Sequence, residues 1–117
     1  MTIELIQNIC QQLKGVTEDI KWDNHLCFNV GGKMFLVTAP DSTPATASFK
    51  VPDDIFEEVA AKEGFSPAAY LARYKWVYVD NINRLNAKEW EKYIKQSYNL
   101  VFAKLPAKVR KELSLAT

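Results

Sequence analysis

The sequence predicts a two-layer α+β fold, in which helices pack on one face of an antiparallel β-sheet. Apolar residues recur at three- and four-residue spacing near both ends of the chain, which indicates amphipathic helices. Between these segments apolar and polar residues alternate, which indicates half-buried strands. The length of 117 residues and the hydrophobic content of 48% fit one domain, residues 1–117, with a single core. The expected order is helix, three or four strands, helix, one or two strands, and helix.

The first helix is expected to follow Thr2, a residue type that commonly caps helix N-termini. Ile6, Ile9 and Leu13 then lie on one face at helical spacing. Gly15 is expected to end the helix, because glycine readily adopts the left-handed backbone found just after helix C-termini.

Strands are expected from Asp19 onward, where the apolar period changes to two. Gly31 and Gly32 predict a two-residue hairpin turn, since both can take the positive φ of primed turns. With this turn, Phe28 faces Phe35 on the core side of the sheet. The same register pairs Leu26 with Val37 on that side and places four residues on the other: Cys27, Asn29, Met34 and Leu36.

The preceding turn has two possible forms. A two-residue turn over 23–24 pairs Trp22 with His25, whereas a three-residue turn through His25 pairs Trp22 with Leu26. The second form keeps both Trp22 and Ile20 on the core face, and we therefore expect it.

Turn residues and apolar periodicity also define the second half of the chain. The expected elements are a strand over 46–51, a helix over 53–60, a helical turn over 68–73, a strand over 76–79, a long helix from Asn86 to Leu105 and a basic helix over 107–113. The long helix has the clearest signals, because Asn86 and Glu89 form a capping box and Pro106 follows its end.

The charge is nearly balanced, at +1, which is too little to mark a nucleic-acid-binding protein by itself. It is unevenly distributed: residues 51–63 hold five acidic and one basic side chain, and residues 88–117 hold seven basic and three acidic ones. Two solvated helix faces of opposite sign would explain this pattern. No secretory signal and no membrane span is recognised, so we expect a cytoplasmic protein without membrane contact.

No recognised catalytic or metal-binding motif occurs. His25 is the only histidine, and Cys10 and Cys27 have no metal-type or CxxC spacing. Glycine-rich phosphate-binding motifs are also missing. We therefore expect a protein that is not an enzyme and that uses no metal and no cofactor, with both cysteines reduced.

The sheet face opposite the core is the more informative surface. Strand parity gives it Met34, Leu36, Lys50 and either the pair Trp76/Tyr78 or the pair Val77/Val79. Aromatic and basic side chains on an open sheet can stack bases and hold phosphates. Alternatively, Trp76 and Tyr78 belong to the core and the rest forms a dimer face or the seat of a helix.

Three segments together resemble the MmcQ/YjbR-like family. They are Trp22-x-x-x-x-Cys27-Phe28-x-Val30-x-Gly32-Lys33-Met34-Phe35, then Pro67-Ala68-x-Tyr70-x-x-Arg73-x-x-Trp76-Val77, and Ser97-Tyr98-x-Leu100-Val101-x-x-Lys104-Leu105-Pro106. The resemblance spans nearly the whole chain. It implies a compact bacterial α+β domain, similar in topology to secretion-chaperone-like and frataxin-like folds.

The resemblance also implies DNA binding through two wing-like hairpins. The matching positions are Lys33, Lys50, Arg73 and Lys75 as phosphate contacts, with Trp76 stacking on a base or anchoring its strand. If this holds, we expect a continuous positive surface that links these four cations and is extended by Lys104, Lys108, Arg110 and Lys111. Asn29 stands where many members carry arginine, so the expected DNA binding is weak and strongly salt-dependent. The alternative is a protein-interaction or chaperone-like module that uses the exposed sheet face.

Overall fold

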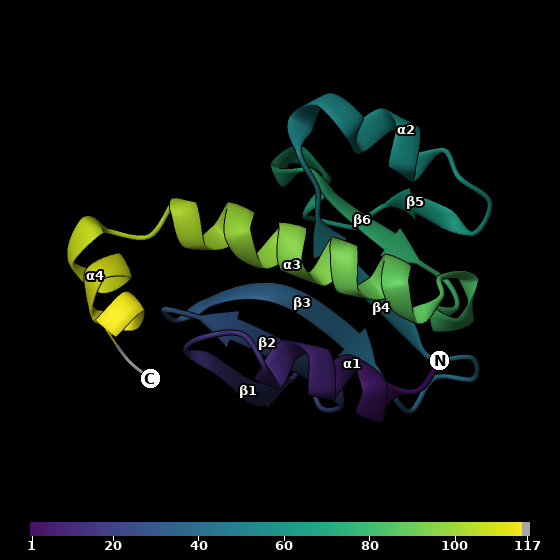
Figure 1. Ribbon diagram of the computed structural model, residues 1–117. Helices are drawn as coiled ribbons and strands as arrows, with labels where there is room; N and C mark the ends of the chain where they lie inside the picture. The colour runs from purple at the N-terminus through teal and green to yellow at the C-terminus, as the bar shows by residue number, and fades with distance from the viewer. Residues whose placement is uncertain (116–117) are drawn as a thin grey trace.

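The chain forms a six-stranded antiparallel sheet in a computed structural model that describes residues 1–115 (Figure 1). The strands are β1 (Val16–Lys21), β2 (His25–Val30), β3 (Lys33–Ala39), β4 (Thr46–Lys50), β5 (Phe65–Pro67) and β6 (Trp76–Val79). Their spatial order is β1-β2-β3-β4-β6-β5, so only β5 is out of sequence order. The expected α+β class and antiparallel sheet are confirmed.

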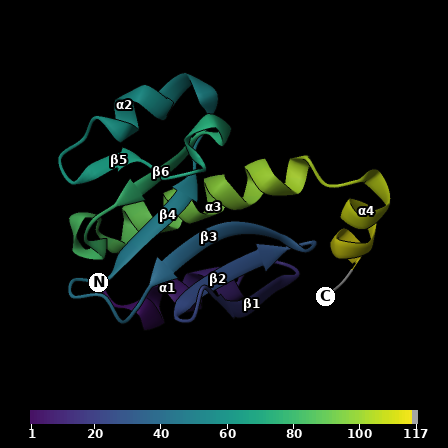
Figure 2. The same ribbon diagram turned by 180° about the vertical axis from the view of Figure 1, so that it is seen from behind.

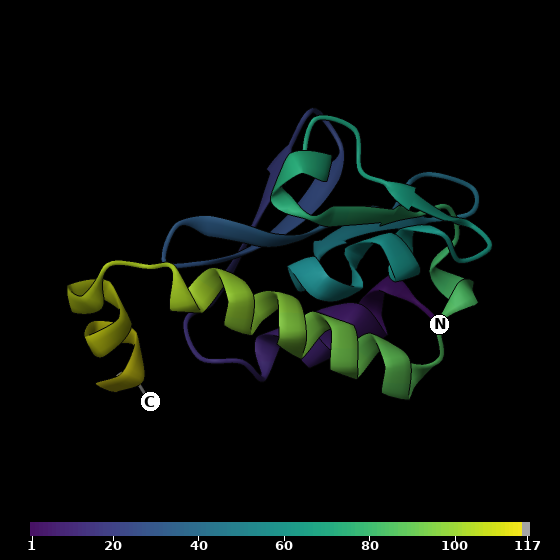
Figure 3. The ribbon, with the colours of Figure 1, turned by 90° about the horizontal axis from the view of Figure 1, so that it is seen from above.

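Helices cover a single face of this sheet. The α-helices are α1 (Ile3–Gln11), α2 (Phe56–Ala60), α3 (Ala87–Ala103) and α4 (Ala107–Leu115), and three short 3-10 helices are η1 (Asp53–Ile55), η2 (Ala72–Tyr74) and η3 (Ile82–Arg84). Figure 3 shows α1, α2 and α3 on the same side of the sheet, and Figure 2 shows the other face of β2 and β3 from behind, without a helix in front of it. No helix within residues 1–115 is long and apolar enough to span a bilayer.

The core lies between the sheet and the long helix α3. Trp90 packs its ring edge-on against Phe49, 5.7 Å between ring centroids, and its indole donates a 2.8 Å hydrogen bond to the carbonyl of Ile82. The buried Ser97 hydroxyl accepts from the backbone N–H of Lys50 and donates to the carbonyl of Phe35. This hydroxyl therefore fixes α3 against β3 and β4 at one point.

A bulge in the β2–β3 hairpin corrects the expected register. Gly31–Gly32 forms the turn as predicted, but Phe28 lies opposite Leu36, and Phe35 is the extra residue. Because an extra residue reverses the alternation of faces, Leu36 enters the core and Val37 faces outward. The predicted outward Leu36 and core-facing Val37 were therefore wrong.

The β1–β2 turn also differs from the prediction. Strand β1 ends at Lys21, and the loop comprises residues 22–24, one position earlier than expected. Trp22 and Asp23 have φ of 50° and 72°, which no strand residue can adopt. Trp22 is consequently exposed rather than buried in the core. Ile20 lies opposite Leu26 in the edge strand β1 and is also exposed.

Before β6 the sequence predicted a helical turn over residues 68–73 and no strand between residues 61 and 67. Residues 65–67 instead form the short edge strand β5, which pairs with β6, and the helical turn is confined to η2. Residues 68–75 thus form a compact connection that projects from the uncovered face of the sheet (Figure 3).

Candidate functional site

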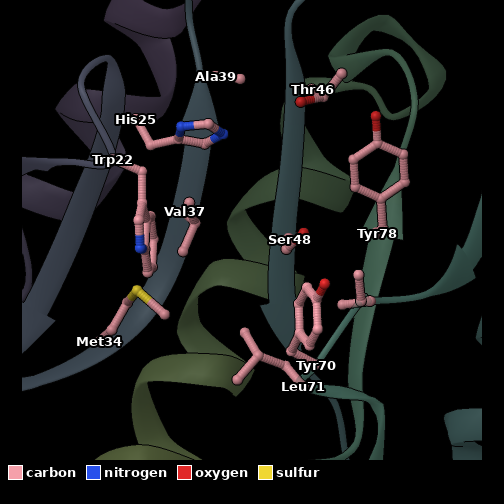
Figure 4. A pocket seen from close by; sticks show the side chains of 12 residues that line it. Trp22, His25, Met34, Val37, Ala39, Thr46, Ser48, Tyr70, Leu71 and Tyr78 are labelled. Atoms are coloured by element: carbon pink, nitrogen blue, oxygen red, sulfur yellow. The ribbon is translucent and has the colours of Figure 1, made fainter.

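An open cleft of about 640 Å³ lies on the sheet face that the helices leave uncovered (Figure 4). We call it the outer cleft. Val37 of β3 and Ser48 of β4 form its floor, with Trp22 on one side and Tyr70 and Tyr78 on the other. The remaining lining residues are His25, Met34, Ala39, Thr46, Ala68, Ala69 and Leu71.

The connection between β5 and β6 builds one wall of the outer cleft. The N–H of Ala68 donates to the carbonyl of Trp76 at 3.0 Å, and the N–H of Leu71 donates to the carbonyl of Ala68 at 3.2 Å. Tyr70, between these anchored residues, takes a left-handed backbone with φ 66°. The turn therefore directs the Tyr70 ring away from the domain.

Two aromatic side chains at the rim are both strained and exposed. Trp22 is 63% exposed at φ 50°, and Tyr70 is 99% exposed at φ 66°. A left-handed backbone costs about 1–2 kcal/mol at a residue with a side chain. Packing of the Tyr70 ring within the domain cannot offset this cost, because the ring is almost fully in solvent. Strain that persists without a packing reason is typical of functional sites.

The outer cleft is mainly apolar, with a few polar groups. Ser48 and Thr46 supply hydroxyls from β4, and Tyr78 supplies one from β6. His25 packs edge-on against Trp22, 5.9 Å between ring centroids, and its Nδ1 is buried without a hydrogen-bond partner. Such a mixture of apolar walls and sparse polar groups is typical of ligand-binding clefts.

Trp76 lies beneath this surface. It belongs to the outer face together with Tyr78, one of the two expected alternatives, but it is only 5% exposed. Its buried neighbours in this small cluster are Cys27, Val37 and Ala68. Trp76 therefore anchors β6 and the cleft wall, because a ring buried to this extent cannot stack on a base without moving.

A second hollow of about 590 Å³ holds three lysines. Lys33, Lys50 and Lys104 line it from β3, β4 and the end of α3, together with Met34, Leu71, Tyr74, Trp76, Val101 and Leu105. We call it the basic groove. Lys33 and Lys50 are thus brought together as expected, and Lys104 joins them.

Lys50 is the recessed lysine of the basic groove. It is 8% exposed, and its ammonium group donates to the carbonyl of Tyr74. Burial lowers the pKa of Lys50, and the nearby charge of Lys104 lowers it further. Lys75 acts in the same direction, and Asp53 opposes them.

Arg73 and Lys75 do not line either hollow. The guanidinium of Arg73 donates to the hydroxyl of Tyr74 at 2.7 Å and lies over the Tyr74 ring, 4.8 Å from its centroid. The ammonium of Lys75 lies 5.1 Å from the centroid of Phe56. These two cations therefore contact neighbouring aromatic rings and do not join Lys33 in the basic groove.

The tip of the β2–β3 hairpin is not a free wing. A Cβ atom at Gly31 would lie 2.6 Å from Leu105 and 3.2 Å from Val109, so the turn packs against the junction of α3 and α4. Figure 1 shows this tip beside α4. The hairpin that the resemblance implied as a wing is thus held against the end of α3.

Nothing within residues 1–115 forms a cluster of three or more metal-ligating side chains. Cys10 and Cys27 are free thiols, as expected. Burial raises the pKa of Cys10 to about 12 and also raises the pKa of Cys27. Both thiols are therefore protonated near neutral pH and poor nucleophiles.

Sequence reasoning missed the two rim aromatics. It assigned Trp22 to the core, although the following Asp23-Asn24 pair is a turn signal that could have placed Trp22 at a loop. Tyr70 lies in an alanine-rich stretch that indicates a helical turn, and no local signal predicts its left-handed backbone.

Comparison with known proteins agrees with this architecture. A family model described as YjbR matches residues 11–100. The chain belongs to the YjbR family. No curated protein matches it.

Two solved structures share the YjbR-family fold. Protein DR2400 of Deinococcus radiodurans, described with the domain DUF419, has 28% sequence identity and a TM-score of 0.86, over 97% of this chain and 88% of that one. A protein from Pseudomonas syringae has 19% identity and a TM-score of 0.69, over 86% of this chain and 98% of that one. The second likeness concerns the fold alone.

Proposed function

We propose that this YjbR-family domain is a non-enzymatic protein-interaction module whose outer cleft binds an apolar segment of a partner protein. The observation that carries the proposal is the pair of rim aromatics, Trp22 and Tyr70, which are exposed on left-handed backbone. A bound segment would bury both rings and so offset the strain that their backbone retains in the free domain.

The size and the openness of the outer cleft support a peptide segment as the ligand. Its volume of about 640 Å³ lies within the range of about 300–1,000 Å³ usual for ligand sites. Tyr70 is 99% exposed at the rim, so a ligand that filled only the floor would leave most of that ring in water. Tryptophan and tyrosine are also the residue types that most often dominate protein interfaces.

A peptide-display experiment tests the proposal. Random peptides displayed on phage are selected against the full chain, and an enriched peptide is then titrated against Trp22→Gly and Tyr70→Gly. Both variants should bind at least about tenfold more weakly, because each loses a central aromatic contact. Leu5→Gln is the matched control, since Leu5 is an exposed apolar residue of α1 on the helical side.

Two outcomes would contradict the proposal. One is the failure of any peptide to be enriched, and the other is equal binding by the rim variants and the wild type.

DNA binding is the second candidate, and the meeting of Lys33 and Lys50 with Lys104 in the basic groove favours it. The phosphate contacts would come from Lys33, Lys50, Arg73 and Lys75, with Trp76 as the anchor of β6. We propose a cytoplasmic location and the absence of catalysis for either candidate, on the sequence grounds given above.

Fluorescence anisotropy with labelled duplex and single-stranded DNA tests the second candidate. Binding should fall steeply between about 50 and 200 mM salt, because it would depend on phosphate neutralisation. A variant with all four phosphate-contacting cations changed to alanine should lose it. Absence of binding to both DNAs at the lower salt concentration would exclude this candidate.

A further inference from the structure

The outer cleft and the basic groove are neighbours, and the basic groove lies where the C-terminal end of α3 meets the ends of β3 and β4. Met34 and Leu71 line both of them, so the two hollows meet at these side chains. A segment that fills the outer cleft can therefore reach the basic groove by passing over the side chains of Met34 and Leu71.

The basic groove carries three positive charges that form no ion pair. It is lined by Lys33, Lys50 and Lys104 and by no acidic residue. Within residues 1–115, ion pairs join Arg84 to Asp80 and Lys95 to Glu91, and none involves the three lysines. Three neighbouring cations with no paired carboxylate repel one another and attract an anion.

Lys50 is the lysine of the basic groove that is best placed to bind an anion. Its ammonium group has three donors, and its one hydrogen bond is to the carbonyl of Tyr74. The group is recessed at 8% exposure, where an unpaired charge is costly and a carboxylate partner is correspondingly favourable. The lowered pKa of Lys50 agrees, since burial and the charge of Lys104 both disfavour its charged form, against a smaller opposing effect of Asp53.

The surroundings favour an acidic peptide over the backbone of DNA. A phosphate backbone is normally contacted by a row of exposed cations. Here Lys50 is recessed and Arg73 is occupied with the Tyr74 hydroxyl. A carboxylate on a side chain or at a chain end can instead reach into the basic groove while neighbouring apolar residues occupy the outer cleft.

We infer that the partner segment pairs apolar anchors in the outer cleft with a carboxylate that is bound in the basic groove by Lys50, Lys33 and Lys104. This inference rests on the proposed protein-interaction function and names the chemistry of the partner. It makes the two hollows a bipartite site that runs from the uncovered sheet face to the C-terminal end of α3.

The peptides enriched on phage test the inference first. They should combine aromatic or aliphatic residues with glutamate, aspartate or a free C-terminal carboxylate at a constant spacing. A labelled synthetic copy of one peptide should lose about tenfold in affinity when its acid is replaced by the corresponding amide. Enriched peptides without acids would overturn this inference and leave the cleft proposal in place, whereas no enrichment would overturn the cleft proposal itself.

A double-mutant cycle then assigns the contact. The variant Lys33→Gln/Lys104→Gln changes two exposed side chains and should leave the fold intact, and Lys50→Met removes the recessed charge while keeping an unbranched side chain. The affinity of the acidic peptide should be lower for both variants than for the wild type, whereas its amide counterpart should bind all three proteins equally. Lys88→Gln, on an exposed position of α3, is the matched charge control.

Two results of the cycle would overturn the inference. The first is equal loss of the acidic and the amide peptide on Lys33→Gln/Lys104→Gln, which would mean that the lysines do not contact the acid. The second is that duplex DNA binds the wild type without displacing the peptide, and that this DNA binding is lost in Lys33→Gln/Lys104→Gln. That result would assign the basic groove to phosphate instead.

Discussion

Replacing Tyr70 with glycine should stabilise the free domain even though it removes a large aromatic side chain. The residue has φ 66°, which costs about 1–2 kcal/mol with a side chain and almost nothing with glycine. Glycine loses more backbone freedom on folding, at about 0.5–1 kcal/mol. Because the ring is 99% exposed, its removal forfeits almost no burial, and the net gain is about 0.5–1 kcal/mol.

Thermal unfolding measures this difference. An unfolding entropy of about 2.1 cal/mol/K per residue gives about 0.25 kcal/mol per degree for this chain, so Tyr70→Gly should raise Tm by about 2–4 °C. Ala69→Gly is the matched control, because Ala69 is an exposed neighbour without a positive φ. It should lower Tm, since only the entropic cost of glycine remains.

A lower Tm for Tyr70→Gly than for the wild type would refute this reasoning. It would mean that the ring makes stabilising contacts in the free domain, and the argument that the strain serves an interaction would then fail. The combination of higher stability with weaker peptide binding is the expected signature of a residue kept for binding.

Three further predictions concern the scaffold. Ser97→Ala should lower the free energy of unfolding in urea by about 1–3 kcal/mol, because the buried N–H of Lys50 loses its acceptor; an unchanged midpoint would contradict the role of Ser97. Asn86→Ala should cost about 1 kcal/mol through loss of the capping box of α3, again measured in urea, with no loss expected for Lys88→Ala, which lies in the same first turn but makes no capping contact. Finally, stability should fall from about pH 9 toward pH 12, because the folded state raises the pKa of Cys10 to about 12 and so retains a proton that the unfolded chain loses. Urea titrations at about pH 8 and pH 10 should show a smaller fall for Cys10→Ala than for the wild type, and an equal fall would exclude this thiol as a source.

Sequence signals predicted correctly those elements that depend on interactions between residues close together in the chain. The capping box at Asn86 and Glu89 and the Gly31–Gly32 turn were expected from neighbouring residues, and both are present. The bulge at Phe35 was not predictable, because residues 34–37 are all apolar and their alternation carries no information about which side faces the core.

The candidate site was less predictable because it depends on distant contacts. Lys33, Lys50 and Lys104 were all expected on one basic surface, but only the packing of α3 on the sheet shows that they share a groove from which Arg73 and Lys75 are absent. Trp22 is a large apolar residue that pattern reasoning assigns to a core. Only the left-handed loop after β1 shows that its ring is exposed.

The packing of Gly31 against Leu105 means that the loops at the two ends of β3 differ in how well they tolerate inserted residues. At Gly31 there is no room even for a methyl group, although Gly32 has open space around it, and residues added on the Gly31 side would push the junction of α3 and α4 away from the turn. At the opposite end, residues 41–44 are exposed and lie between β3 and β4. An epitope tag or fluorophore for studies of the basic groove therefore belongs in that loop, which is remote from Lys33 but adjoins Ala39 and Thr46 of the outer cleft.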